Sequence, residues 1–320
     1  MKQISRDQSE LIDAVIAELT TGGISPGVLE KDIHVTDALE ALAALSHDHV
    51  QLVFCGGTSL SKAHRLIERM SEDIDLKVII NPSHGMSNSK LKSHLSELKA
   101  KVASTLEEIG LEERKDQRLA LNGNRYFASH WRYAPAYESD VSLRPYLSLE
   151  LTTRIAQHAI VTKDIGYLFE QLAKQKITNV SLDCATVEET LSEKILSFLR
   201  RYSQHRAGVM RAQWDKALVR HVYDVYCINS LDPDALHRAR AQFKALVDYD
   251  VGEFGVQYEA FAKNPKQTLL DALAKTEGDP DLHDEYKTHL IPLVFGPVRP
   301  SYPKAHQVFS QCADTLLQSL

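Results

Sequence analysis

Two groups of residues about twenty positions apart combine a phosphate-binding backbone with metal-binding side chains. Residues 54–76 read FCGGTSLSKAHRLIERMSEDIDL. The first part holds Gly56 and Gly57, and glycines let a ligand approach the backbone closely. The last part holds Asp73 and Asp75, two positions apart. On a strand these carboxylates project to the same side, so they need a cation to offset their repulsion, or one of them must take up a proton.

Oxygen ligands of this kind suit Mg²⁺, which keeps several waters and bridges substrate phosphates. Glu150 lies on the polar face of a second predicted strand, and we expect it to be the third carboxylate of a two-metal site. Thr58 and Ser59 can donate hydroxyl hydrogen bonds to phosphate oxygens, and Lys62 adds a positive charge. Either half alone is also typical of an ordinary loop or a solvated strand. The two in this order predict an NTP substrate and two Mg²⁺ ions.

Hydrophobic periodicity predicts the elements that must position these groups. Residues 51–55 form a short buried strand, residues 60–70 a helix, and residues 74–80 a strand with the two aspartates on its polar face. Gly22 and Gly23 separate two helices near the N-terminus. The other predicted elements are helices over 11–19, 26–45 and 91–110, strands over 125–134 and 145–153, and a helical pattern from 186 to the end.

This pattern predicts an α/β (α+β) fold, with a small mixed sheet and helices followed by a mainly helical C-terminal half. We place the domains at residues 1–182 and 183–320. The active site is expected in the cleft between them.

The composition bounds the class of protein. The chain has 320 residues and a formal net charge of -6, so nucleic-acid binding would need a local basic patch. Its four cysteines form no CxxC pair, which favours free thiols in a reducing cytoplasm. The sequence contains no HxxH or HExxH motif, so a zinc site is not expected. The longest apolar stretch is far too short to span a membrane.

The GGTS turn, the helix and the Asp-x-Asp strand together resemble the nucleotidyltransferase superfamily of the DNA polymerase β type. More narrowly, GGTSLSKAHRLIERMSEDIDL resembles the AbiEii/AbiGii family of toxins, which belong to bacterial abortive-infection, phage-defence and type IV toxin–antitoxin systems. The related MenT toxins share this core. The segments LEKDIHVTDALEAL, TVEETLSEKILSFLRR and DKALVRHVYDVY are also similar to that family.

The resemblance implies a nucleotidyltransferase core and assigns residues to it one by one. It places the triphosphate on the turn from Gly56 to Ser59 and the metals on Asp73 and Asp75. It assigns phosphate contacts to Lys194 and Arg220, and a catalytic role to Asp224. The family's last motif usually has an acid where this chain has His221. From the residues alone, Lys216, Arg220 and Asp224 share one helix face, and a solvated, ion-paired face is the favoured explanation.

The resemblance also implies partners: an RNA acceptor, most specifically the tRNA 3′ end, and a cognate antitoxin. The segment RRYSQHRAGVMR fits an RNA contact, because arginines alternate there with residues that can stack on a base. These residues are Arg200, Arg201, Tyr202, His205, Arg206 and Arg211. A basic loop between helices is an equal explanation.

Three alternatives stay open. The chain could nucleotidylate a protein or a small molecule, act as a non-catalytic nucleotide-binding regulator, or serve only as an interaction protein. The sequence gives neither the preferred NTP nor the oligomeric state.

Overall fold

The computed structural model describes residues 1–18, 24–138, 143–154, 159–174, 180–210 and 212–320. Gly22 and Gly23, predicted to end the first helix, lie outside these ranges, as does Arg211 of the basic segment. The described chain divides into two compact units. One contains Met1–Arg65, Met70–Ala156 and Ile160–Ala185, and the other contains Leu66–Arg69 and Thr186–Leu320. The predicted domain boundary at residues 182 and 183 stays a prediction.

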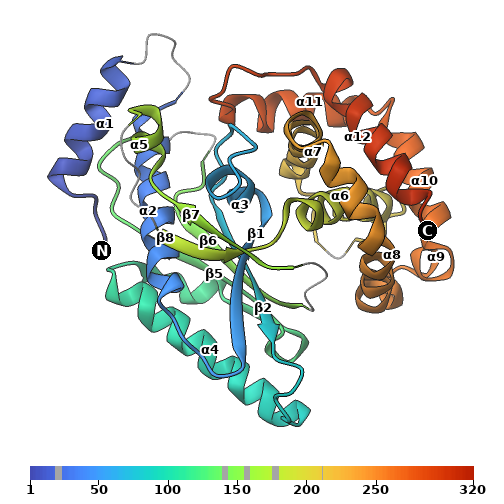
Figure 1. The fold of residues 1–320 in the computed structure, drawn as a ribbon, viewed down its shortest axis with the longest axis horizontal. Helices are drawn as coiled ribbons and strands as arrows, with labels where there is room; N and C mark the ends of the chain where they lie inside the picture. The colour runs from blue at the N-terminus through green and yellow to red at the C-terminus, as the bar shows by residue number, and fades with distance from the viewer. Residues whose placement is uncertain (19–23, 139–142, 155–158, 175–179, 211) are drawn as a thin grey trace. The chain divides into compact units, whose positions relative to one another are not determined.

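The first unit is built on a mixed sheet with helices, which confirms the predicted fold class (Figure 1). Its helices are α1 (Arg6–Glu18), α2 (Pro26–Ala43), α3 (Gly56–Lys62), α4 (Asn88–Glu108), α5 (Leu168–Leu172) and the 3-10 turns η1 (Lys115–Gln117) and η2 (Asn122–Asn124). Its strands are β1 (Val50–Cys55), β2 (Asp73–Ile80), β3 (Glu112–Glu113), β4 (Leu119–Leu121), β5 (Tyr126–Arg132), β6 (Leu147–Arg154), β7 (Val161–Ile165) and β8 (Val180–Cys184).

The strands lie in the order β3-β5-β6-β2-β1-β8-β7, with β4 paired to β5. Strand β2 pairs antiparallel with β1 and parallel with β6. The parallel register places Asp75 opposite Glu150 and Asp73 opposite Ser148. Side chains at paired positions point to the same face of a sheet. The two strands predicted to carry the carboxylates are therefore direct neighbours.

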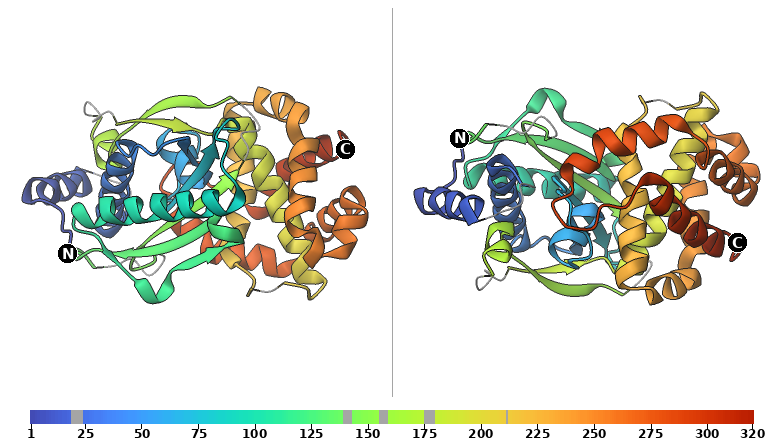
Figure 2. Two further views of the ribbon diagram at one scale, coloured as in Figure 1. Left: turned by 90° about the horizontal axis from the view of Figure 1, so that it is seen from below. Right: turned by 90° about the horizontal axis from the view of Figure 1, so that it is seen from above.

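One face of this sheet is covered by α2 and α4, and Figure 2 shows α4 lying across the strands. The apolar residues of β2 (Ile74, Leu76 and Val78) pack into this core with leucines from both helices. Alternation along the strand leaves Asp73 and Asp75 on the opposite face. The predicted division of the strand into an apolar and a polar face is confirmed.

The helix predicted over residues 60–70 is wrong in its position. Helix α3 already begins at Gly56 and ends at Lys62, so the diglycine forms its first turn. Arg65 has a φ of +55°, a left-handed conformation that does not continue a helix. Beyond it the backbone carbonyl of Glu68 accepts hydrogen bonds from Phe295 and Gly296, which draws Leu66–Arg69 into the second unit.

The second unit is helical, as the pattern after residue 186 predicts. Helix α6 starts at Thr186, whose hydroxyl accepts a hydrogen bond from the amide of Glu189 and so caps the helix. The unit contains α6 (Val187–Arg206), η3 (Lys216–Val219), α7 (Arg220–Leu231), α8 (Asp234–Phe254), η4 (Gly255–Gln257), α9 (Glu259–Lys263), α10 (Pro265–Thr276), α11 (Pro280–His289), η5 (Ile291–Leu293) and α12 (Tyr302–Leu317). Among the residues that the structure describes, no helix has the length and apolar character needed to cross a membrane.

Candidate functional site

The sheet brings three carboxylates onto its open face. Asp75 and Glu150 are register partners on adjacent parallel strands, and Asp73 lies two residues before Asp75. Opposite positions on neighbouring strands have Cβ atoms about 5 Å apart. All three side chains are partly exposed. The predicted grouping of Glu150 with the aspartate pair thus has a direct geometric basis.

Gly56 lies against the same carboxylates. It has a φ of +75°, and a Cβ built on it would overlap Asp75 Oδ2 and lie 3.1 Å from Asp75 Cγ. Cys55, the residue before it, pairs with Asp75 across β1 and β2. The diglycine turn and the Asp-x-Asp strand therefore face one another at the end of β1. Only a residue without a side chain allows this approach.

The hydroxyl residues of the turn point into the protein. Thr58 is fully buried, and its Oγ1 donates to the backbone carbonyl of Asp73 and contacts Ser71 Oγ at 2.9 Å. Ser59 is also fully buried. These positions correct the expectation that both hydroxyls face a phosphate. Thr58 instead fixes α3 against the start of β2, which leaves the turn's backbone as its ligand-binding part.

Lys62 does not face the carboxylates either. Its Nζ lies 2.5 Å from Asp32 Oδ1, and the side chain of Lys62 is only 5% exposed. The other oxygen of Asp32 accepts a hydrogen bond from the amide of Leu168 at 2.7 Å. A lysine held in a buried pair has no geometry for a substrate phosphate. The predicted phosphate contact of Lys62 is therefore corrected to a structural ion pair.

Asp32 belongs to a run of three charged residues on α2, Glu30 to Asp32, that form polar contacts with the segments around the site. Glu30 accepts hydrogen bonds from the amides of Ala136 and Tyr137, at 2.7 and 3.1 Å. Lys31 is fully buried and bonds to Glu72, the residue before Asp73. Burial lowers the pKa of Lys31, and the charge of Glu72 partly offsets this effect. The LEKD segment thus contacts the loop at Ala136, the loop at Glu72, and helices α3 and α5.

Arg144 is a site residue that the sequence analysis missed. Its Nη1 lies 2.6 Å from Asp73 Oδ1. Its backbone amide donates to Glu72 Oε2 at 3.0 Å, and its carbonyl accepts from Lys31 Nζ. The only sequence signal is its place three residues before the strand that carries Glu150. Nothing in a single arginine of a loop indicates this contact.

In the second unit Asp224 is the centre of a buried charge cluster. Asp224 is fully buried, and Arg69 binds it through two hydrogen bonds of 2.7 Å. Lys194 Nζ also lies 2.7 Å from Asp224 Oδ2. Burial alone would raise the pKa of Asp224, but the charges of Arg69 and Lys194 outweigh it and hold the pKa well below its usual value. Both oxygens are occupied in this structure, so Asp224 joins Arg69 to Lys194, and the catalytic contact implied by the family resemblance stays a prediction.

His221, the departure from the family's last motif, contacts the same lysine. Its Nδ1 donates to the backbone carbonyl of Lys194 at 3.1 Å. Burial and the charge of Lys194 lower the pKa of His221 well below its usual value. Residues 221 and 224 of α7 therefore both hold Lys194 in place. Arg220 points elsewhere, and its Nε donates to the carbonyl of His289 at 3.2 Å.

Two residues of the basic segment of α6 are internal. Arg200 pairs with Asp250 at 2.9 Å and lies 3.7 Å above the ring of Phe254. Tyr202 is buried and donates to Asp279 at 2.7 Å. These two side chains are buried, so among the described residues Arg201, His205 and Arg206 are the ones that remain for the predicted basic and aromatic surface.

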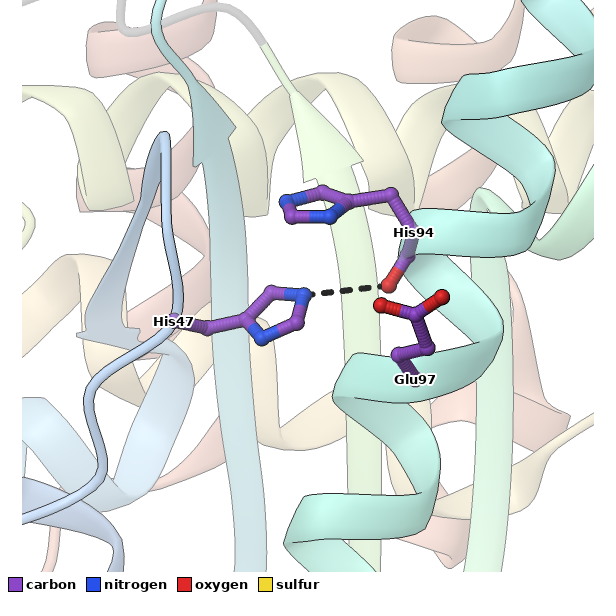
Figure 3. Close-up of side chains that lie close together, drawn as sticks. All are labelled: His47, His94 and Glu97. Carbon is purple, nitrogen blue, oxygen red and sulfur yellow. Dashed lines mark hydrogen bonds between the residues drawn. The ribbon is translucent and has the colours of Figure 1, made fainter.

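A cluster of His47, His94 and Glu97 stands at the other end of β1 (Figure 3). Its candidate ligand atoms lie within 4.8 Å of one another. His47 Nε2 donates to the carbonyl of His94 at 3.1 Å, and His94 Nε2 donates to the carbonyl of Asp48 at 2.6 Å. The rings stack with centroids 4.1 Å apart. These bonds join the loop before β1 to α4, so we assign the cluster a structural role.

The carboxylate face stays the predicted metal site, although among the described residues it is His47, His94 and Glu97 whose candidate ligand atoms lie within 4.8 Å of one another. Three carboxylates on adjacent strands supply the hard oxygen donors that Mg²⁺ takes in proteins. The absence of a side chain at Gly56 keeps space beside Asp75 Oδ2. One arginine already lies on Asp73, which shows that this face accepts a cation.

Gly56→Ala tests the approach of the turn to Asp75. The new Cβ must displace the Asp75 carboxylate, so we expect nucleotidyl transfer to fall by about a hundredfold or more, as for loss of a positioned group. Gly85→Ala is the matched control, because Gly85 also has a positive φ of +62° but nothing lies within 4 Å of its Cβ position. Both variants should lose about 1 kcal/mol of stability. Equal activity in the two variants would contradict this geometry.

The partly buried His221 predicts a pH dependence of stability. Its pKa is lower in the folded chain than in the unfolded chain, so the unfolded chain binds the proton first as the pH falls. Stability should therefore fall below about pH 6.5, and His221→Gln should remove about 1 kcal/mol of the loss between pH 7 and 5.5. Urea unfolding at both pH values measures this effect. His237→Gln, at an exposed position of α8, should keep the wild-type slope.

Residues 37–308 match the family described as nucleotidyl transferase AbiEii toxin, type IV TA system. This match spans most of the chain, so the chain belongs to that family of nucleotidyltransferase toxins. Among solved structures, MenT4, a nucleotidyltransferase toxin from Mycobacterium tuberculosis H37Rv, is 16% identical with a TM-score of 0.40. The alignment covers 84% of this chain and 99% of that chain. No curated protein matches the chain.

Membership of this family confirms the resemblance and the enzyme class predicted from the sequence. The chain is a nucleotidyltransferase toxin of a type IV toxin–antitoxin system.

Proposed function

We propose that the chain transfers a nucleoside monophosphate from an NTP to the 3′ end of a tRNA, with release of pyrophosphate and dependence on Mg²⁺. The observation that carries this proposal is the register of Asp75 with Glu150 beside Gly56. It supports one polar face on which a triphosphate and its cations can be held together.

In this proposal Asp73, Asp75 and Glu150 hold the metal, and the backbone of Gly56 and Gly57 faces the β- and γ-phosphates. Divalent ions bound there would offset the charge of the triphosphate and of the leaving pyrophosphate. Thr58 keeps the turn at a fixed distance from β2 through its bond to the Asp73 carbonyl. The Lys31–Glu72 pair fixes the start of the same strand.

Glu150 has a second role open to it. A carboxylate beside the reacting groups can accept the proton of the acceptor hydroxyl as a general base. The contacts of Lys194 and Arg220 with phosphates stay predictions from the family resemblance, as does the cleft expected between the two parts of the chain. We also propose a cytoplasmic site of action, where NTP and tRNA occur together, and a cognate antitoxin as partner.

The direct test incubates the wild-type chain with each α-labelled NTP, total RNA and cell extract, followed by separate RNA and protein gels. We expect label in the tRNA band, lost on chelation of divalent ions with EDTA. Label on protein instead would favour nucleotidylation of a protein. Binding of NTP without any release of pyrophosphate would favour a non-catalytic regulator.

A further inference from the structure

Arg144 is anchored by its backbone while its guanidinium reaches the carboxylate face. The amide and carbonyl of Arg144 are held by the buried Glu72 and Lys31. Its Nη1 lies 2.6 Å from Asp73 Oδ1, and the side chains of Arg144 and Asp73 are 38% and 31% exposed. The main chain is thus fixed, whereas the side chain lies at the surface and is able to change its rotamer.

A partly exposed pair of this kind contributes little to folding stability. The effect of the Arg144 charge on cation binding by Asp73 is larger. The guanidinium is permanently charged, so it cannot leave the carboxylate by losing a proton. A divalent ion on the same Asp73 oxygen would compete with the guanidinium, because the two positive charges repel each other at this distance.

We propose that Arg144 is the resting counter-ion of Asp73, that it competes with the first divalent ion, and that it moves to the triphosphate when metal and NTP bind. This inference rests on the proposed function of the carboxylate face. The planar guanidinium binds phosphate oxygens in a bidentate manner, and the NTP is the strongest anion that enters the site. The anchored backbone keeps the displaced guanidinium within one side-chain length of Asp73.

The test measures Mn²⁺ affinity in the absence of nucleotide, by calorimetry or electron paramagnetic resonance, for the full chain and for Arg144→Gln and Arg144→Lys. Removal of the competing charge should tighten Mn²⁺ binding about tenfold in Arg144→Gln. Arg144→Lys should stay near the wild type. Arg132→Gln is the matched control, because Arg132 pairs with Glu112 on the same sheet and carries the same charge.

A second measurement follows binding of a non-hydrolysable NTP with saturating Mn²⁺. Here Arg144→Gln should bind about tenfold more weakly, the opposite direction from its effect on the metal. A purely structural role would not tighten metal binding.

Unchanged or weaker Mn²⁺ affinity in Arg144→Gln overturns the proposal, and so does the absence of Mn²⁺ binding in every variant. Unchanged NTP affinity overturns the transfer to the phosphate. Labelling of tRNA by the wild type is measured on the same preparation. Its failure would sink the proposed function, whereas normal labelling with unchanged Mn²⁺ affinity would sink only the role of Arg144.

Discussion

Replacement of both Asp73 and Asp75 by asparagine should lower nucleotidyl transfer by at least about a thousandfold and leave the chain folded. The two carboxylates lie on the open face of β2, away from the apolar core under α2 and α4. Asparagine keeps their size but removes both charges, so the site loses its attraction for a divalent ion. Labelled-NTP transfer onto tRNA and growth inhibition on expression measure the effect.

The matched control removes two charges from the same sheet. Asp164 lies on β7 and accepts from the hydroxyl of Ser181, whereas Asp183 lies on β8 and accepts from the hydroxyl of Thr162 and the side-chain amide of Gln51. The Asp164→Asn and Asp183→Asn double variant should keep transfer within about twofold of the wild type, since surface changes of this kind have small effects. An Asp73 and Asp75 double variant that still labels tRNA, or still stops growth, would contradict the assigned site.

Asp224→Ala should destabilise the chain by about 3–5 kcal/mol, because it leaves Arg69 and Lys194 as buried charges without their carboxylate. A loss of that size lowers the melting temperature by roughly 10 °C. Arg69 also forms a backbone bridge with Val294. We therefore expect Leu66–Arg69 to lose its fixed position in the second unit, and calorimetry measures the change.

An exposed ion pair in the same unit supplies the control. Asp248 pairs with Lys244 on α8, with both side chains more than half exposed, so Asp248→Ala should change stability by no more than about 0.5 kcal/mol. A double-mutant cycle of Asp224→Ala with Arg69→Met measures the interaction energy between Asp224 and Arg69 separately from their other contacts. Asp224→Ala with an unchanged melting temperature and no transfer would show that Asp224 acts on substrate, as the family resemblance implies. It would contradict a stabilising role of Asp224 between Arg69 and Lys194.

Much of the carboxylate site follows from the sequence because it depends on local periodicity. The alternation of apolar and acidic residues over 73–80 is enough to predict the faces of β2. The same argument places Glu150 on the polar face of its strand. Periodicity does not encode the order of strands in the sheet. It therefore does not predict that this strand pairs with β2 and places Glu150 opposite Asp75.

The errors concern charged residues whose partners are distant in the chain. Lys62 follows the turn closely enough to suggest a phosphate ligand, yet its partner is Asp32, thirty residues earlier. Arg144 lies seventy-one residues from Asp73, and Arg69 lies 155 residues from Asp224. The pairs of Lys62 and Arg69 form because a buried charge needs a partner, and any opposite charge that the fold brings near satisfies this need.

The bounds of α3 show the same limit. The helical pattern over residues 60–70 is real, but the left-handed Arg65 and the hydrogen bonds of Glu68 with Phe295 and Gly296 end the helix early. Gly296 has no room for a side chain there, because a Cβ would overlap Glu68. Tertiary contacts with a segment more than two hundred residues away thus override the local propensity.

The central claim is that the diglycine turn and the three carboxylates bind one NTP together with its metal. Crystals grown with Mn²⁺ and a non-hydrolysable NTP test it most directly, through the anomalous scattering of manganese. The account predicts a manganese peak among Asp73, Asp75 and Glu150, with the β- and γ-phosphates against Gly56 and Gly57. A triphosphate bound elsewhere, or manganese absent from these three carboxylates while the nucleotide is present, would contradict it.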